Sequence, residues 1–308
     1  MTPTPPGAGM METMTAPNYS ATAQDWLQAA RPHTWANAFA PVIVGTGAAA
    51  SNNGAHLGRA FLALIVAWAL IIGVNYANDY SDGIRGTDDD RTGPTRLTAS
   101  GLAAPARVKS AAFVAFFVAA VAGAILAVMS AWWLIVVGAA CIAAAWFYTG
   151  GKNPYGYQGL GEAAVFVFFG LVAVLGTEFT QSGVVSWTGF AAAFAIGSIS
   201  AAVNLANNIR DIPTDSVAGK HTLAVRLGDA RARRLFTLLT LAPFIATLFL
   251  ALVSLPALAA LIALPLAVAS VLKVLRGATG AALIPVLGLN GRAMLVWAVV
   301  TAVALAFA

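Results

Sequence analysis

Long apolar windows constrain this chain more than any other feature. A helix that crosses about 30 Å of hydrocarbon needs roughly 20 mainly apolar residues. Such windows recur along almost the whole sequence, at 35–50, 60–80, 110–129, 131–149, 162–178, 187–208, 235–254, 256–274 and 289–307. Only 9% of the residues are charged, against roughly 25% in soluble domains. The sequence therefore predicts an all-α, polytopic membrane protein with nine transmembrane helices around a central cavity that cytoplasmic loops cap.

The amino-terminal segment has a different composition. Residues 1–24 are rich in Pro, Thr, Ala and Gly and contain no apolar stretch of signal-peptide length, which predicts a disordered cytoplasmic tail. Residues 20–30 then predict a short interfacial helix, with Thr22 as its cap. We expect the nine-helix domain to occupy residues 25–308.

The positive charges predict an orientation. Every Lys and Arg except Arg59 falls in the amino-terminal segment, in the loops after the second, fourth, sixth and eighth windows, or beside them. By the positive-inside rule these segments are cytoplasmic and the carboxyl terminus is outside, in a multi-pass protein of the cell membrane. Topology accounts for the net charge of +5, so the charge gives no reason to expect a nucleic-acid partner.

Acidic residues gather at two of these cytoplasmic helix ends. Asn75, Asp79 and Asp82 share one helical face by their i, i+4 and i, i+3 spacing, and Asp88 follows them. Asn207 and Asp211 repeat the i, i+4 pair at the end of the sixth window. Pro213 predicts the end of that helix, so Asp215 is expected to return from the following loop.

Carboxylates this close repel one another near a low-dielectric core unless a multivalent cation compensates them. Mg²⁺ fits, because it takes one or two carboxylates together with water and phosphate oxygens. Two facing clusters would hold two Mg²⁺ ions with a diphosphate between them. The alternative is that each cluster is a solvated helix end.

Cationic partners for such a diphosphate are also present. Arg31 precedes the first window, and Tyr148 and Lys152 follow the fourth with a hydroxyl and an ammonium four residues apart. These positions are equally consistent with roles at the membrane surface: an Arg whose side chain reaches the interface, a Tyr at the interface, and a Lys that only marks the cytoplasmic side.

Taken together, these motifs resemble the UbiA-type superfamily of intramembrane prenyltransferases, which has nine transmembrane helices, two aspartate-rich motifs and a Tyr-x-x-x-Lys motif. The chain is most similar to the branch that prenylates dihydroxynaphthoate in menaquinone synthesis. The segments that carry this likeness are 31–35, 40–45, 78–88 with Gly93 and Pro94, 157–162, 207–211 and 226–228. Gly86 stands where the general motif has its third aspartate.

The resemblance implies the roles of individual residues. It assigns metal binding to Asp79, Asp82, Asp88, Asp211 and Asp215. It implies substrate contacts for Arg31, Asn75, Tyr148, Lys152 and Asn207, with Lys152 and the aspartates other than Asp88 as the catalytic groups. Arg96 would contact phosphate or the acceptor carboxylate. An equally good interpretation is that it is one of the positive charges that mark the cytoplasmic side.

The implied reaction joins a polyprenyl group, from its diphosphate, to 1,4-dihydroxy-2-naphthoate with loss of CO2 and diphosphate, giving demethylmenaquinol. Hydroxybenzoate, haem or a sugar phosphate as acceptor remains an alternative. A transporter is a further alternative, but the acids lie at one membrane face and not at the midplane. The sequence determines neither the tail length nor the oligomeric state.

Overall fold

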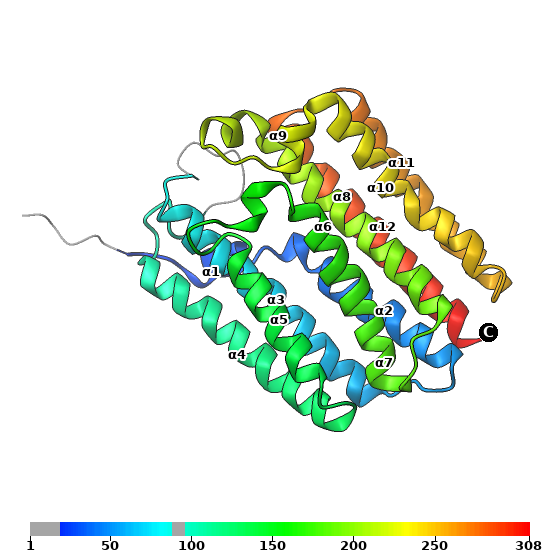
Figure 1. The fold of residues 1–308 in the computed structure, drawn as a ribbon. Helices are drawn as coiled ribbons and strands as arrows, with labels where there is room; N and C mark the ends of the chain where they lie inside the picture. The colour runs from blue at the N-terminus through cyan, green and yellow to red at the C-terminus, as the bar shows by residue number, and fades with distance from the viewer. Residues whose placement is uncertain (1–18, 88–95) are drawn as a thin grey trace, which may run out of the picture.

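The protein is an all-helical bundle. The computed structural model describes residues 19–87 and 96–308. Its long helices run side by side (Figure 1), with short helices at their ends. In chain order the elements are α1 (Ala23–Ala29), η1 (Pro32–Thr34), α2 (Ala36–Ser51), α3 (Leu57–Gly83), α4 (Pro105–Met129), α5 (Leu134–Phe147), η2 (Tyr155–Gln158), α6 (Gly161–Val165), η3 (Phe166–Leu175), α7 (Gly176–Ser182), α8 (Trp187–Val217), α9 (Leu223–Leu227), α10 (Asp229–Leu250), η4 (Leu255–Ala263), α11 (Leu264–Leu275), η5 (Gly280–Leu283) and α12 (Ile284–Ala306).

Several helices are suited to crossing a membrane. Among the described residues, 7 helical segments are long and apolar enough to do so. The two remaining predicted windows correspond to α2, with 16 residues, and α5, with 14 residues. Both are shorter than a typical span. The protein is therefore a multi-pass membrane protein, while the expected count of nine spans is not established by helix length.

The short helix α1 begins where the sequence predicts. Thr22 and Asp25 form a reciprocal capping box: the Asp25 backbone N–H donates to the Thr22 hydroxyl at 3.2 Å, and the Thr22 N–H donates to the Asp25 carboxylate at 2.8 Å. The hydroxyl of Tyr76 donates to the Trp26 carbonyl at 3.0 Å and so ties α1 to α3. Residues 1–18 of the predicted tail lie outside the described residues.

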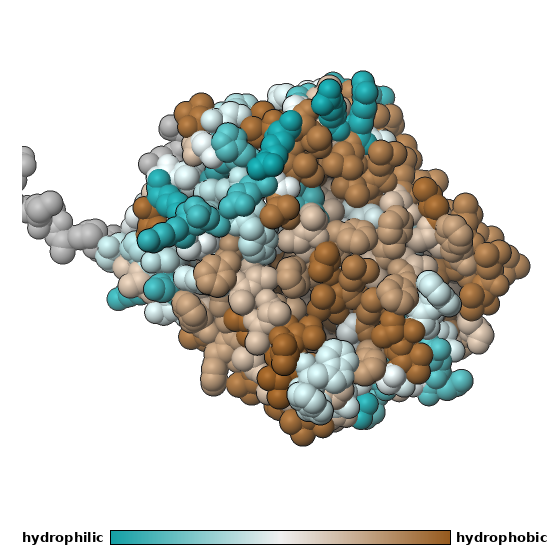
Figure 2. All heavy atoms as spheres, viewed as in Figure 1, coloured by the Kyte–Doolittle hydropathy of each residue, from teal (hydrophilic) through white to brown (hydrophobic). Residues whose placement is uncertain are grey.

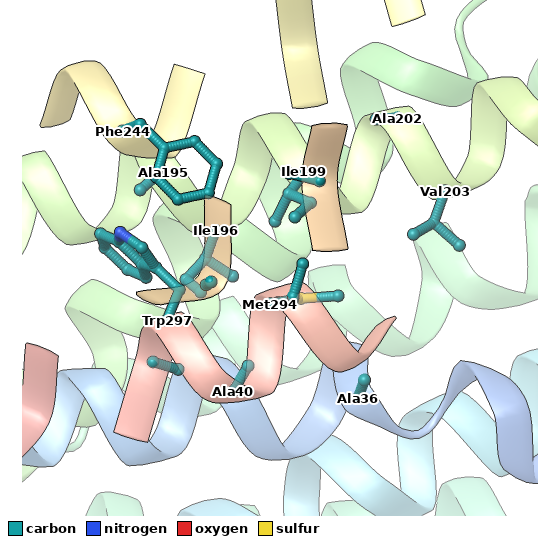
Figure 3. Packing of buried hydrophobic residues seen from close by; sticks show 14 of the residues in the cluster. Ala36, Ala40, Ala195, Ile196, Ile199, Ala202, Val203, Phe244, Met294 and Trp297 are labelled. Atoms are coloured by element: carbon teal, nitrogen blue, oxygen red, sulfur yellow. The ribbon is translucent and has the colours of Figure 1, made fainter. Parts of the chain in front are cut away.

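The main hydrophobic core lies between α2, α8 and α12, with α10 behind α8. Ala36 and Ala40 of α2 face Ile196 and Ile199 of α8 and the large side chains of α12 (Figure 3). Trp297 of α12 is almost completely buried. Its indole N–H donates to the Thr247 hydroxyl of α10 at 2.8 Å, which satisfies the one polar atom of this ring.

A close helix crossing brings the fifth predicted span against α8. This span is α6, η3 and α7 in succession, and η3 is a π-helix. A Cβ added to Gly170 would lie 2.5 Å from the Gly197 Cα of α8. Only glycine at this crossing lets the two backbones approach so closely, in the way that small residues do between membrane helices.

The connecting segments that matter for function meet at one end of the bundle. At this end lie α9, the segment between α5 and α6, and the described residues between α3 and α4, 84–87 and 96–104; the carboxyl terminus lies at the other end (Figure 1). Figure 2 shows hydrophilic residues concentrated toward the same end and a largely hydrophobic surface over the middle of that face. The bundle therefore has one polar, loop-covered end.

Candidate functional site

A polar pocket of about 90 Å³ lies at the loop-covered end. Its walls come from the end of α3, the segment between α5 and α6, and the end of α8 with the turn that follows. Three carboxylates, three cations and four asparagines line it: Asp82, Asp211 and Asp215; Arg31, Arg96 and Lys220; and Asn78, Asn204, Asn207 and Asn208. The pocket therefore unites both aspartate-rich motifs, as the sequence predicts.

Asp82 is the meeting point of three chain segments. Its carboxylate accepts a hydrogen bond from the Tyr157 hydroxyl. It also lies 3.6 Å from the Lys220 ammonium and 3.8 Å from the Arg96 guanidinium. Burial, and then the Asp82 charge, raise the pKa of Tyr157, so the phenol keeps the proton that it donates.

Asp79, one turn earlier on α3, has a different environment. Its two carboxylate oxygens accept the backbone N–H groups of Leu97 and Thr98 at 2.8 Å and 2.9 Å. The residue is completely buried and does not line the pocket. Asp79 thus holds the segment after residue 95 against α3, and this segment carries Arg96 into the pocket.

The second aspartate motif corrects one expectation. Helix α8 does not end at Pro213 but continues to Val217, so Asp215 lies on the helix one turn after Asp211. A proline within a membrane-type helix is tolerated when neighbouring groups satisfy the freed carbonyl. Asp211 receives a bidentate hydrogen bond from Arg210, at 2.7 Å and 2.8 Å. Asp211 and Asp215 both line the pocket.

Glu162 and Tyr148 orient two asparagine side chains of α8. Glu162 of α6 accepts a hydrogen bond from the Asn208 amide nitrogen at 2.6 Å. The Tyr148 hydroxyl donates to the Asn204 amide oxygen at 3.3 Å. Because Glu162 takes the nitrogen of Asn208, the amide oxygen of Asn208 is turned away from it. These contacts fix which polar atoms Asn204 and Asn208 present.

Arg31 and Asn75 belong to one arrangement. The Asn75 amide donates to the Ala30 carbonyl at 3.0 Å and to the Thr34 hydroxyl at 3.1 Å. It thereby holds the turn in which Arg31 has a positive φ of 52°. A non-glycine residue in this conformation is uncommon and marks a constrained turn. The turn places Arg31 in the pocket wall, whereas Asn75 lines the neighbouring apolar cavity.

The remaining predicted residues are distributed unevenly. Arg96, Tyr148 and Asn207 line the polar pocket. Lys152 is exposed and lines neither the polar pocket nor the neighbouring apolar cavity. The segment between Phe147 and Tyr155 carries it outward. Asp88 lies outside the described residues.

A second, apolar cavity adjoins the polar pocket and shares part of its lining. Its volume is about 430 Å³, and its walls are mainly apolar side chains of α3, α4, α5 and η3. Five residues line both spaces: Arg31, Asn78, Tyr148, Asn204 and Asn207. The combined space suits an amphipathic ligand that has a charged head and a long apolar chain.

The donors in the polar pocket suit a hard cation only in part. Within residues 19–87 and 96–308, no three His, Cys, Asp or Glu side chains gather as a complete metal site. Asp82, Asp211, Asp215 and the asparagine oxygens are nevertheless the ligand types that Mg²⁺ prefers. Because Mg²⁺ usually completes its shell with water and phosphate oxygens, the pocket fits Mg²⁺ bound together with a phosphorylated ligand.

Several pocket residues were not singled out as site residues from the sequence. In the sequence analysis Lys220 is only one of the positive charges on the cytoplasmic side, and Tyr157 is only part of a segment that carries the family resemblance. Asn204 and Asn208 were not singled out, although their spacing offers a signal. Asn204, Asn208, Asp211 and Asp215 recur every three or four residues, which is one face of a helix.

Comparison with known proteins agrees with this arrangement. A sequence profile described as "UbiA prenyltransferase family" matches residues 38–284. The chain is 56% identical over 282 residues to a 1,4-dihydroxy-2-naphthoate octaprenyltransferase of Mycobacterium tuberculosis, covering 92% of this chain and 97% of that one. It is 37% identical over 239 residues to the protein of the same name from Escherichia coli, covering 75% and 78%.

Solved structures share the fold. The structure of a UbiA homologue from Archaeoglobus fulgidus bound to DMAPP and Mg²⁺ superposes with a TM-score of 0.62. The match covers 91% of this chain and 99% of that one, at 16% sequence identity. At this identity the likeness establishes the arrangement of helices.

Proposed function

Because this chain belongs to the UbiA prenyltransferase family, we propose that it transfers a polyprenyl group from polyprenyl diphosphate to 1,4-dihydroxy-2-naphthoate. The products are demethylmenaquinol, CO2 and diphosphate. The observation that carries this proposal is that the polar pocket and the apolar cavity adjoin, with five residues lining both. The relatives named for this reaction align over nearly the whole chain.

The substrate fits the two spaces by its chemistry. The diphosphate would lie in the polar pocket, where Arg31 and Arg96 supply cationic hydrogen-bond donors. The isoprenoid chain would lie in the apolar cavity, which it fills without exposing hydrocarbon to water. Asn78, Tyr148 and Asn204 line both cavities, so they would surround the reacting carbon–oxygen bond of a substrate bound in this way.

The pocket carboxylates would hold Mg²⁺, with Asp82 on the α3 side and Asp211 and Asp215 on the α8 side. We propose two ions, one on each side. When bound, Mg²⁺ supplies stabilisation of the negative charge that develops on the departing diphosphate. The homologue from Archaeoglobus fulgidus, described as bound to DMAPP and Mg²⁺, supports Mg²⁺ as the metal in general.

The bond changes then follow. The allylic carbon–oxygen bond breaks, and its electron pair leaves with the diphosphate. The electron-rich ring forms the new carbon–carbon bond at the carbon that bears the carboxylate. The carbon–carboxylate bond breaks, its electron pair returns to the ring, and CO2 leaves. No nucleophile from the protein is needed.

The residues of the chain act mainly by shielding and positioning the allylic cation. The apolar cavity excludes water, which would otherwise capture the cation. Phe168 and Phe169 line this cavity, and aromatic faces stabilise a nearby cation by about 0.5–2 kcal/mol. Arg31 and Arg96 retain the diphosphate after the bond breaks.

The membrane arrangement follows from the charges. We infer that α2 and α5 also cross the bilayer, which gives nine spans over residues 25–308. The polar pocket and the amino terminus would face the cytoplasm, and the carboxyl terminus would lie outside the cell membrane. The concentration of hydrophilic residues toward the pocket end (Figure 2) supports this orientation.

A reconstituted assay tests the proposal. Purified protein in detergent receives labelled polyprenyl diphosphate, 1,4-dihydroxy-2-naphthoate and Mg²⁺, and prenylated naphthol and CO2 are measured. We expect equal amounts of both products and no turnover in EDTA. Prenylation of hydroxybenzoate but not of the naphthoate would overturn the acceptor assignment. Folded protein that uses no aromatic acceptor would overturn the proposed reaction.

A further inference from the structure

Lys220 is a buried cation in the polar pocket that neither aspartate motif includes. Only 8% of the residue is exposed. Its ammonium lies 3.6 Å from an Asp82 carboxylate oxygen and 4.7 Å from the centre of the Tyr157 ring. Lysine is rarely buried without a compensating group, and here both a carboxylate and an aromatic face compensate it.

The end of α8 directs Lys220 into the pocket. Ala218 caps the helix, and Gly219 has a positive φ of 71°. The Lys220 backbone N–H then donates to the Asp215 carbonyl at 2.9 Å. This is the hydrogen bond of a Schellman turn, which reverses the chain at a helix end and favours glycine at the left-handed position. The turn places Lys220 in the wall of the pocket that Asp211 and Asp215 also line.

The pairing of Lys220 with Asp82 suits an exchange of partners. A lysine ammonium is a compact charge on a flexible stem with three donors. When a diphosphate enters with Mg²⁺, the anion competes with Asp82 for the ammonium, and the metal competes with Lys220 for the carboxylate. After the exchange every charge still has a partner of opposite sign, so no buried ion is left uncompensated.

We propose that Lys220 is a diphosphate-binding residue that Asp82 holds in place until the substrate enters. On entry, the ammonium moves to the diphosphate oxygens and Asp82 becomes available to the metal. Lys220 thereby supplies the ammonium that the sequence motif assigns to the exposed Lys152. This inference rests on the proposed function only for its substrate class, a prenyl diphosphate with Mg²⁺.

Two binding measurements on the full-length protein in detergent test the exchange. Calorimetry measures the affinity for inorganic diphosphate in the presence of Mg²⁺, and separately the affinity for Mg²⁺ alone. We expect Lys220→Gln to weaken diphosphate binding by about ten- to a hundredfold, the value of a charged hydrogen bond. The same variant is expected to bind Mg²⁺ alone more tightly, because Asp82 loses a competing cation.

Matched variants separate this role from a structural one. Lys273→Gln removes an exposed lysine from the last turn of α11 and is expected to leave both affinities unchanged. Lys220→Arg keeps the charge and is expected to retain more diphosphate affinity than Lys220→Met. This pair replaces the glutamine variant if that variant does not fold.

The exchange predicts opposite changes in the two affinities of Lys220→Gln: weaker diphosphate binding and tighter Mg²⁺ binding. Unchanged diphosphate affinity in Lys220→Gln, or a parallel loss of diphosphate and Mg²⁺ binding, would overturn the exchange. Wild-type protein that binds no diphosphate would overturn both this inference and the proposed substrate class. A wild-type protein that binds diphosphate through Lys220 but does not prenylate naphthoate would overturn the proposed function alone.

Discussion

Helices α3 and α8 both line the polar pocket, but they present their carboxylates in different ways. On α3, Asp79 is turned to the backbone of Leu97 and Thr98, and only Asp82 reaches the pocket. On α8, Asp211 and Asp215 both line it. On α3, one aspartate therefore holds a neighbouring segment in place and the other lines the pocket, whereas on α8 both aspartates line the pocket.

The difference comes from what covers each helix end. Leu97 and Thr98 lie against the end of α3, and their backbone N–H groups need acceptors where they are removed from water. Asp79 provides two. Helix α8 instead extends through Pro213 to a Schellman turn, so its carboxylates are not needed to hold a covering segment. We expect substitutions on the two helices to have different consequences.

The largest loss of activity is expected on α8. Asp215→Asn removes a negative charge from the pocket while keeping the size of the side chain. We expect kcat/KM for naphthoate prenylation to fall by about a hundredfold or more, with a higher Mg²⁺ concentration needed for half-maximal rate. Thermal unfolding in detergent serves as the control for folding. Activity within tenfold of wild type would show that this wall does not hold the metal.

The matching change on α3 is expected to affect stability first. Asp79→Asn leaves one acceptor oxygen and places an amide N–H₂ against a backbone N–H. We expect the free energy of unfolding to fall by about 1–3 kcal/mol, and the Leu97 and Thr98 amides to exchange hydrogen faster. The Mg²⁺ dependence of the remaining activity should resemble that of wild type. A shift as large as that of Asp215→Asn would place Asp79 at the metal and remove the contrast between the helices.

A smaller effect is expected at the hydroxyl that joins α3 to the segment after α5. Tyr157→Phe deletes the hydrogen bond to Asp82 and leaves the ring beside Lys220. The loss of one such bond corresponds to a reduction in kcat/KM of about three- to tenfold. Tyr155→Phe is a suitable comparison, because its hydroxyl donates to the Ala144 carbonyl at 2.8 Å and not to Asp82. Equal effects on Mg²⁺ dependence in both variants would contradict a specific role for Tyr157.

The smallest effect is expected at Lys152, which lies on neither helix wall. Its side chain is exposed, so Lys152→Gln removes a charge that water screens effectively. We expect a change in kcat/KM of less than about threefold, since exposed charge contacts contribute little. A loss comparable to that of Asp215→Asn would mean that the segment between α5 and α6 rearranges when substrate binds.

The sequence alone determined the class of protein and singled out every charged residue of the pocket except Lys220. Apolar windows require helices in a bilayer, because each buried backbone group must find a partner within its own segment. Periodic spacing placed Asn75 and Asp79, and Asn207 and Asp211, on common faces. The Thr22 cap of α1 was equally predictable, since a capping box involves residues only three positions apart.

Only the tertiary structure decided which of these groups faces the pocket. Sequence spacing fixes the direction in which each side chain points around its helix. What the side chain meets in that direction depends on segments far away in the chain. Tyr157 reaches Asp82 across 75 positions in the sequence, and Lys220 reaches it only because the chain reverses at Gly219. In this structure Asp79, which the motif assigns to the metal, accepts the backbone N–H groups of Leu97 and Thr98, and the side chain of Lys152 is exposed. Burial and ion pairing depend on the three-dimensional packing of distant segments, which local sequence patterns do not specify.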